Sequence, residues 1–225
     1  MTNKSERRGD ALSKARVVEA AIAILDEGGE GGLTFRVLAA RLATGAGAIY
    51  WHVADKEALL AAAAEAVIGG AVNEGADPRV AIRALLLGVF DAISAHPWVG
   101  TQLVREPWQP AMGEVFERIG GWLDALGVAE TGQFDAASAL VNALLGAAAH
   151  QAAAARMLPR DTARGAFLEA VTARWSRGDP AAYPFIQRMA QQLRDHDDRA
   201  QFLAGIDLIL DGLILDGQIL DGLKV

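Results

Sequence analysis

The chain has 225 residues, 52% of them hydrophobic, and a formal net charge of −7 at pH 7. This length can bury a substantial core, and a composition rich in Ala and Leu with few aromatic residues favours helices over sheets. The sequence contains no cysteine, which excludes disulfides, thiolate nucleophiles and Cys-ligated metal sites and is typical of a reducing compartment.

The first predicted helix begins at Ser13 and ends where the segment GGEGG, residues 28 to 32, interrupts the apolar pattern. Its apolar residues recur at spacings of three and four, which place them on one helix face. These residues are Ala15, Val18, Ile22 and Leu25.

A second, short helix is expected after the glycines, with Thr34 as its N-cap and with Leu38 and Leu42 on its inner face. The segment TGAG then breaks the chain before a third helix over residues 48 to 53, in which Ile49 and Val53 face inward. Three helices of these lengths, with a tight glycine-containing turn before the third, are typical of a helix-turn-helix module.

Asp55 is expected to cap a fourth helix that runs to about residue 73. We therefore predict a DNA-binding domain over residues 1–56, a connecting helix over about 56–73, and a ligand-binding and dimerisation domain over 74–225. The charge distribution fits this division, because residues 1–56 carry a net charge of +1 and the remainder carries −8.

The second part of the chain is predicted to contain longer helices. Asp77 and Pro78 open one that Pro97 interrupts, and Pro107 and Pro110 precede another that ends at Leu126. Further helices are expected over residues 131 to 158, 163 to 177, 184 to 195 and 198 to 212. The tail repeats ILDG with a five-residue period that holds no single helix face, so we expect the last helix to fray there. The predicted fold is all-α, with an N-terminal three-helix bundle joined to a larger helical domain.

The outer face of the third helix has the residue types of a helix that enters the DNA major groove. Small residues let the backbone approach base edges, while phenol, indole and imidazole groups can donate to phosphate oxygens. Lys56 adds a positive charge beside the free N–H groups that start the next helix. This face consists of Gly47, Ala48, Tyr50, Trp51 and His52. The alternative is that the three large side chains fill a gap between the domains, with only Lys56 in solvent.

Residues 33 to 60, LTFRVLAARLATGAGAIYWHVADKEALL, resemble the DNA-binding module of the TetR family of bacterial repressors. The resemblance is carried by Leu33, Thr34, Arg36, Leu42, the run Tyr50-Trp51-His52-Val53, Lys56, Leu59 and Leu60. It implies that Thr34, Tyr50, His52 and Lys56 bind phosphates and that Arg36, Ala48 and Trp51 contact bases. It also implies a repressor that binds double-stranded operator DNA and is released by an effector.

The sequence departs from the family pattern at the turn, where Gly45, Ala46, Gly47 and Ala48 stand in place of polar residues. Direct base readout by the third helix should therefore be sparse, and Arg36 with DNA shape should carry much of the specificity. The basic segment KSERR ahead of the first helix either follows the minor groove or is a solvated tail.

A homodimer is expected, because one module covers only one half-site of a palindromic operator. The predicted dimer surface combines the Ala-rich helix 133–157 with the helix 198–212 as a four-helix bundle. Small residues in the first of these helices, Ala147, Ala148 and Ala152, would allow close approach.

Large aromatic residues gather in the middle of the chain, and polar residues interrupt the long Ala-rich helix. Core packing accounts for most of the aromatic residues, but Asn142 and His150 need polar partners if they are buried. A pocket for a small, largely apolar effector explains both observations, and contacts across the dimer are the alternative for Asn142 and His150. The candidate pocket residues are Trp98, Trp108, Phe116, Trp122, Asn142, His150, Phe167 and Trp175.

Catalysis is not expected, because GAGAIY lacks the third glycine and the preceding strand of a dinucleotide loop, and no nucleophile elbow is present. The four histidines show no metal-ligand spacing, so we predict no metal and no cofactor. No segment reaches the ~20 apolar residues of a membrane span, and we expect a soluble cytoplasmic protein without a membrane partner. The remaining alternative is a helical ligand-binding or interaction module without DNA binding.

Overall fold

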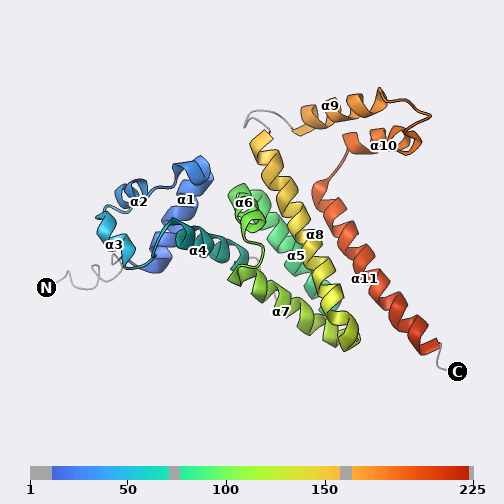
Figure 1. Cartoon of the computed structure of the whole chain (residues 1–225), viewed down its shortest axis with the longest axis horizontal. Coiled ribbons are helices and arrows are strands. Elements are labelled where there is room, and N and C mark those ends of the chain that lie inside the picture. Colours follow the sequence, from blue (N-terminus) through green and yellow to red (C-terminus); the bar gives the residue numbers. More distant parts are fainter. Residues whose placement is uncertain (1–11, 71–76, 158–163, 223–225) are drawn as a thin grey trace.

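A computed structural model describes residues 12–70, 77–157 and 164–222 (Figure 1). These described residues form eleven helices and no strand, which confirms the predicted all-α fold. A small N-terminal module lies at one end of the molecule, and a larger helical body occupies the rest (Figure 1).

Four helices make up the N-terminal module and its connection to the body. Side-chain oxygens of Ser13, Thr34 and Asp55 each accept a hydrogen bond from the backbone N–H three residues further on. These bonds satisfy N–H groups that a helix start leaves free, so they fix where three of the helices begin and confirm the caps predicted at Thr34 and Asp55. The four helices are α1 (Lys14–Gly32), α2 (Phe35–Arg41), α3 (Ala46–Tyr50) and α4 (Lys56–Gly69).

The first helix differs from its prediction in length and in its buried face. It continues through the GGEGG segment to Gly32, with a single break at Gly29, whose φ of 63° is a conformation that glycine adopts without strain. Ala15 is exposed and Ile22 is only half-buried, contrary to the predicted stripe. The buried face is instead formed by Val17, Val18, Ala21, Ile24 and Leu25.

The third helix is shorter and begins earlier than predicted. It starts at Ala46, directly after Gly45, and contains five residues. The prediction that Ile49 and Val53 face inward is confirmed, because both are buried, although Val53 lies beyond the helix end. These two side chains hold the short helix against the module, so its opposite face remains open.

The helical body is built around four helices. Asp77 caps the first of them through its side chain, as predicted. The helix ends just before Pro97, which confirms the predicted interruption, and Pro97 also begins a further helix that turns away by 110°. Proline suits this position because the first N–H of a helix has no partner within the helix. The four helices are α5 (Pro78–Ala95), α6 (Pro97–Arg105), α7 (Pro110–Ala125) and α8 (Glu130–Met157).

Three helices complete the chain: α9 (Arg164–Ser176), α10 (Pro184–Arg194) and α11 (Asp198–Gly222). The first two pack on each other as a hairpin that stands away from the body, while α11 lies along α5 and α8 (Figure 1). The predicted end of the last helix near residue 212 is wrong, because α11 continues through the ILDG repeats to Gly222. The side chains after Leu213 lie outside the described part of the chain.

Ion pairs join α11 to α5 along its length. Arg79 donates to Asp211 at 2.6 Å, and Arg83 pairs with Asp207. Nearer the start of α11, Arg199 donates to both carboxylate oxygens of Asp91, at 2.8 and 2.9 Å. This bonding raises the pKa of the Arg199 guanidinium.

Within the described ranges, no single helix is long and apolar enough to cross a membrane. The helices α5 and α6 reach that length only when they are taken together across their 110° bend.

Candidate nucleic-acid interface and adjoining cavity

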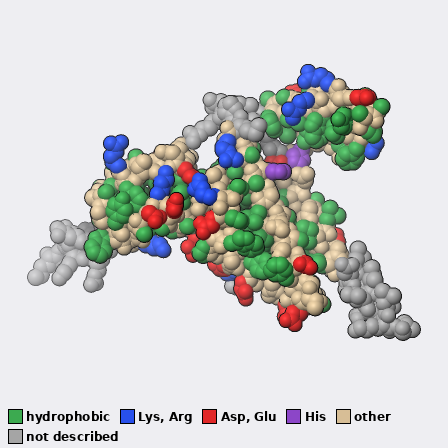
Figure 2. Space-filling model, in the orientation of Figure 1, with side chains coloured by type: hydrophobic (Ala, Val, Ile, Leu, Met, Phe, Trp, Pro, Cys, Tyr) green, Lys and Arg blue, Asp and Glu red, His purple; other side chains and the backbone are tan. Residues whose placement is uncertain are grey.

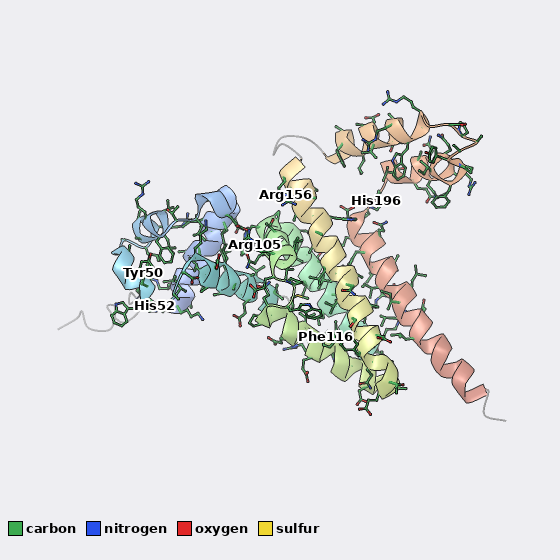
Figure 3. The ribbon with its side chains drawn as sticks, viewed as in Figure 1. Tyr50, His52, Arg105, Phe116, Arg156 and His196 are labelled. Carbon is green, nitrogen blue, oxygen red and sulfur yellow. The ribbon has the colours of Figure 1, made fainter. Side chains whose placement is uncertain are left out.

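The outer face of α3 presents two large aromatic side chains to solvent. Trp51 is 90% exposed and Tyr50 is 55% exposed. The Tyr50 ring stacks on Phe35, with 4.5 Å between ring centroids and 3° between their planes, so its orientation is fixed. The interpretation of these residues as filler between the domains is therefore wrong for Tyr50 and Trp51. Figure 3 shows Tyr50 and His52 at the end of the module away from the body.

Small residues leave the rest of this face open. Gly47 is exposed, and a Cβ added to it would meet no atom within 4 Å. Ala48 is half-buried, and so is His52, whose backbone N–H donates to the Ile49 carbonyl at 2.9 Å. A surface with this relief can lie close to a flat partner such as the floor of a DNA groove.

The two arginines of α2 differ in whether their guanidinium groups are paired with a carboxylate. Arg41 donates to both carboxylate oxygens of Glu27, at 2.9 and 3.0 Å. Arg36 is exposed and has no hydrogen bond or ion pair with any other described residue. The guanidinium of Arg36 is therefore available to a partner.

Lys56 is not free in solvent, contrary to the alternative in which the aromatic residues only fill a gap. It is half-buried, and its ammonium donates to the backbone carbonyl of Glu30 at 2.6 Å. An ammonium group has three donors, so two remain for a phosphate. The bond ties the start of α4 to the end of α1.

Comparison with known proteins identifies the family to which this module is similar. Residues 17–63 match the family model described as bacterial regulatory proteins, tetR family. The whole structure is similar to that of the transcriptional regulator SCO7222, a TetR from Streptomyces coelicolor, with a TM-score of 0.81 and 49% sequence identity. That similarity covers 90% of this chain and 98% of the other. The chain belongs to the TetR family.

Two further proteins are similar to the chain over a shorter stretch or at a lower sequence identity. An HTH-type transcriptional regulator from Saccharopolyspora erythraea is 33% identical over 107 residues, which is 46% of this chain and 45% of that protein. The matched segment thus spans less than half of this curated relative. The TetR family protein ActR from S. coelicolor, solved in complex with actinorhodin, has a TM-score of 0.74 over 92% of this chain and 98% of its own, at 21% identity. This last similarity concerns the fold.

Between the TetR-type module and the body lies a cavity of about 1130 Å³. The end of α1 forms one wall with Leu25, Asp26 and Glu30, and α5, α6, the end of α8 and the start of α11 form the others. A cavity of this volume can hold a drug-sized molecule. Because α1 contributes to its lining, a ligand that fills the cavity lies against the DNA-binding module.

The predicted effector-site residues do not gather at this cavity, because Trp98 is the one member of that set in its lining. Trp108 is 62% exposed and lies edge-on to Phe116, with 6.1 Å between ring centroids. Asn142 and His150 are both exposed within the chain and neither lines this cavity, so the pocket alternative is not supported for them here. The others lie elsewhere: Trp122 is half-buried on α7, and Phe167 and Trp175 belong to the α9–α10 hairpin.

Polar contacts beside the cavity hold the module to the body. Asp26 Oδ1 lies 2.7 Å from His96 Nδ1 and accepts a hydrogen bond from Trp98 Nε1 at 2.8 Å. Glu30 accepts from Arg105 at 2.9 Å (Figure 3). Sequence reasoning missed this set, since Asp26 and Glu30 look like ordinary solvent-facing residues of α1 and their partners lie 70 or more positions away.

The cavity wall also contains a polar atom without a partner. The Oε1 atom of Gln151 is buried and accepts no hydrogen bond. A buried acceptor in this state is costly unless something donates to it. Among the described residues, no group of three or more His, Asp or Glu side chains is placed to hold a metal ion.

Proposed function

We propose that the chain is a ligand-responsive transcriptional regulator that binds a palindromic operator as a homodimer. The observation that carries this proposal is the solvent-exposed face of α3, with Trp51 90% exposed inside a TetR-type module. An indole with this exposure does not belong to the core, so its face is open to a binding partner. In this proposal, residues 1–56 bind DNA, α4 connects, and residues 74–225 bind the second copy and form most of the effector site, with the end of α1 completing it.

On DNA, the module would use two sets of contacts. Phosphate contacts fix the position of the helix, and base contacts discriminate between sequences. The proposed phosphate ligands are Thr34, Tyr50, His52 and Lys56. The proposed base contacts come from Arg36, Ala48 and Trp51, with Gly47 allowing close approach.

Exposed faces of α8 and α11 support the homodimer. On α8, Ala139, Asn142, Gly146 and His150 are exposed at spacings of three and four, so they lie along one face. On α11, the large apolar side chain of Leu208 is 75% exposed. Two copies joined along these faces would form a four-helix bundle and give Asn142 and His150 partners across it.

Two of the three residues predicted for close approach between copies, Ala148 and Ala152, pack within their own chain instead. Both are fully buried, and their atoms lie against Gly100 of α6. They therefore hold the body together, and Gly146 takes their place in the proposed interface.

The cavity beside α1 is the proposed effector site. An occupant that fits only one orientation of the module would shift the population away from the DNA-binding state. The loss of operator affinity cannot exceed the ligand's preference between the two states. The structure of ActR with actinorhodin is a precedent for a ligand bound to this fold.

Selection of random DNA duplexes by the purified protein tests the proposal. We expect a palindromic site to be enriched, and its binding should weaken steeply between two salt concentrations because neutralised phosphates release counterions. No enrichment and negligible binding at low salt would favour a ligand-binding or interaction module without DNA binding.

A matched pair of arginine variants tests the base contact within the same experiment. Arg36→Ala should reduce the preference for the selected site over random DNA by about tenfold or more. Arg41 lies on the same helix as Arg36 but is already paired with Glu27 of α1, so Arg41→Ala should change this preference little. If Arg36→Ala weakened specific and random DNA equally, Arg36 would be only a phosphate contact.

A further inference from the structure

Carboxylates outnumber cations in the lining of the cavity beside α1. They approach from three sides, since α1, α5 and the start of α11 all contribute acidic residues. The lining contains Asp26, Glu30, Asp91, Asp197 and Asp198 against Arg156 and Arg199. Figure 2 shows acidic side chains gathered where the module meets the body.

Arginines already neutralise two of these carboxylates. Asp91 is paired with Arg199, and Glu30 is paired with Arg105. Asp26 differs, because no Lys or Arg among the described residues contacts it. Its hydrogen bonds from His96 and Trp98 both use Oδ1, which leaves Oδ2 without a described partner.

Beside Asp26 the cavity wall is apolar. Leu25, Phe90 and Trp98 all line it and are each at most 6% exposed. Aliphatic and aromatic surfaces of this kind hold the body of an organic ligand, and an aromatic face also attracts a cation. Arg156 is exposed at the end of α8, at the margin of the same cavity (Figure 3).

We propose that the cavity binds an amphipathic organic cation, with Asp26 receiving the positively charged group and the Leu25, Phe90 and Trp98 wall receiving the apolar part. A carboxylate with one oxygen unpaired beside an apolar wall favours a cationic partner more strongly than the same carboxylate in bulk water. Gln151 also lines the cavity, and its Oε1 has no hydrogen-bond partner.

This inference rests on the proposed function, because it names the class of effector and explains how binding reaches the DNA. Asp26 belongs to α1 of the DNA-binding module, while His96 and Trp98 belong to the body. A cation at Oδ2 draws the Asp26 carboxylate toward the ligand and away from these two donors, so occupancy weakens the contact that holds the module in place. The ligand thus acts on α1 directly and needs no relay through α4.

Three probes with the same dodecyl chain test the ligand class by calorimetry below their micellar concentrations: dodecylamine, dodecanol and dodecanoate. We expect dodecylamine to bind the full-length protein at least about tenfold more tightly than the other two. Asp26→Asn should reduce its affinity to that of dodecanol, while leaving dodecanol unchanged. Glu117→Gln removes the same charge from an exposed site on α7 and should change neither affinity.

Several results would overturn the inference. Tightest binding of dodecanoate, lost in Arg156→Gln, would show an anion site, and equal binding of all three probes would show an apolar site without charge preference. Absence of binding by every probe would also refute it. Operator binding is measured on the same samples without probe, so an intact operator complex would show that the ligand class has failed while the proposed regulator stands.

Discussion

Replacing Gly100 by alanine should destabilise the body, because α6 and α8 approach most closely at this residue. A Cβ at Gly100 would lie 2.7 Å from the carbonyl oxygen of Ala148 and 3.3 Å from the Cβ of Ala152. A backbone carbonyl cannot turn aside as a side chain does, so the helices must separate. Overpacking of this kind costs about 1–3 kcal/mol, and the better helix propensity of alanine returns roughly 0.5–1 kcal/mol. The net cost is about 0.5–2 kcal/mol, and at about 2–4 °C per kcal/mol for a chain of this size we expect Tm to fall by roughly 1–8 °C.

Thermal unfolding followed by circular dichroism at a fixed protein concentration measures this difference, since association would make Tm depend on concentration. Gly121→Ala is the matched control. Gly121 is an exposed residue of α7, and a Cβ there would meet no atom within 4 Å. This control should raise Tm by roughly 1–4 °C through helix propensity alone. If Gly100→Ala raised Tm to the same extent, the close approach of α6 and α8 would be refuted.

Three further variants test the module, a helix cap and the dimer. Trp51→Ala should lower operator affinity by about tenfold or more in fluorescence anisotropy and leave Tm unchanged, because the indole is 90% exposed; unchanged affinity would remove Trp51 from the interface. Asp77→Ala should cost about 0.5–2 kcal/mol in urea unfolding, because the Asp77 side chain caps α5; an equal midpoint would show that the cap is dispensable. Leu208→Glu should convert dimer to monomer in sedimentation, whereas Leu126→Glu, at another exposed leucine, should not. A Leu208→Glu protein that remained dimeric would place the interface elsewhere.

The capped helix starts could be predicted because each depends on a few neighbouring residues. Thr34, Asp55 and Asp77 accept bonds from N–H groups three residues away, and a sequence window shows such pairs. At Pro97 the end of α5 was predicted, but the start of α6 at the same residue was not. The continuation of α11 beyond residue 212 was missed since its five-residue repeat marks no helix face.

The candidate interface could be predicted in part, and the cavity could not. Burial of Ile49 and Val53 fixes by helix geometry which side chains of α3 point outward, and Trp51 follows. The cavity depends on packing among helices far apart in the sequence, as the contact of Asp26 with Trp98 illustrates. The bond from Lys56 to a carbonyl of α1 likewise has no signature in residue types.

The ion pairs between α5 and α11 set the sliding register of the two helices. Asp91 faces Arg199, Arg83 faces Asp207, and Arg79 faces Asp211, so each step along one helix matches an equal step back along the other. A slip of one turn, about 5.4 Å, would move Asp91 away from Arg199 and Arg83 away from Asp207. The pairs therefore favour a single register of the two helices, and the Asp91–Arg199 pair sets that register beside the cavity.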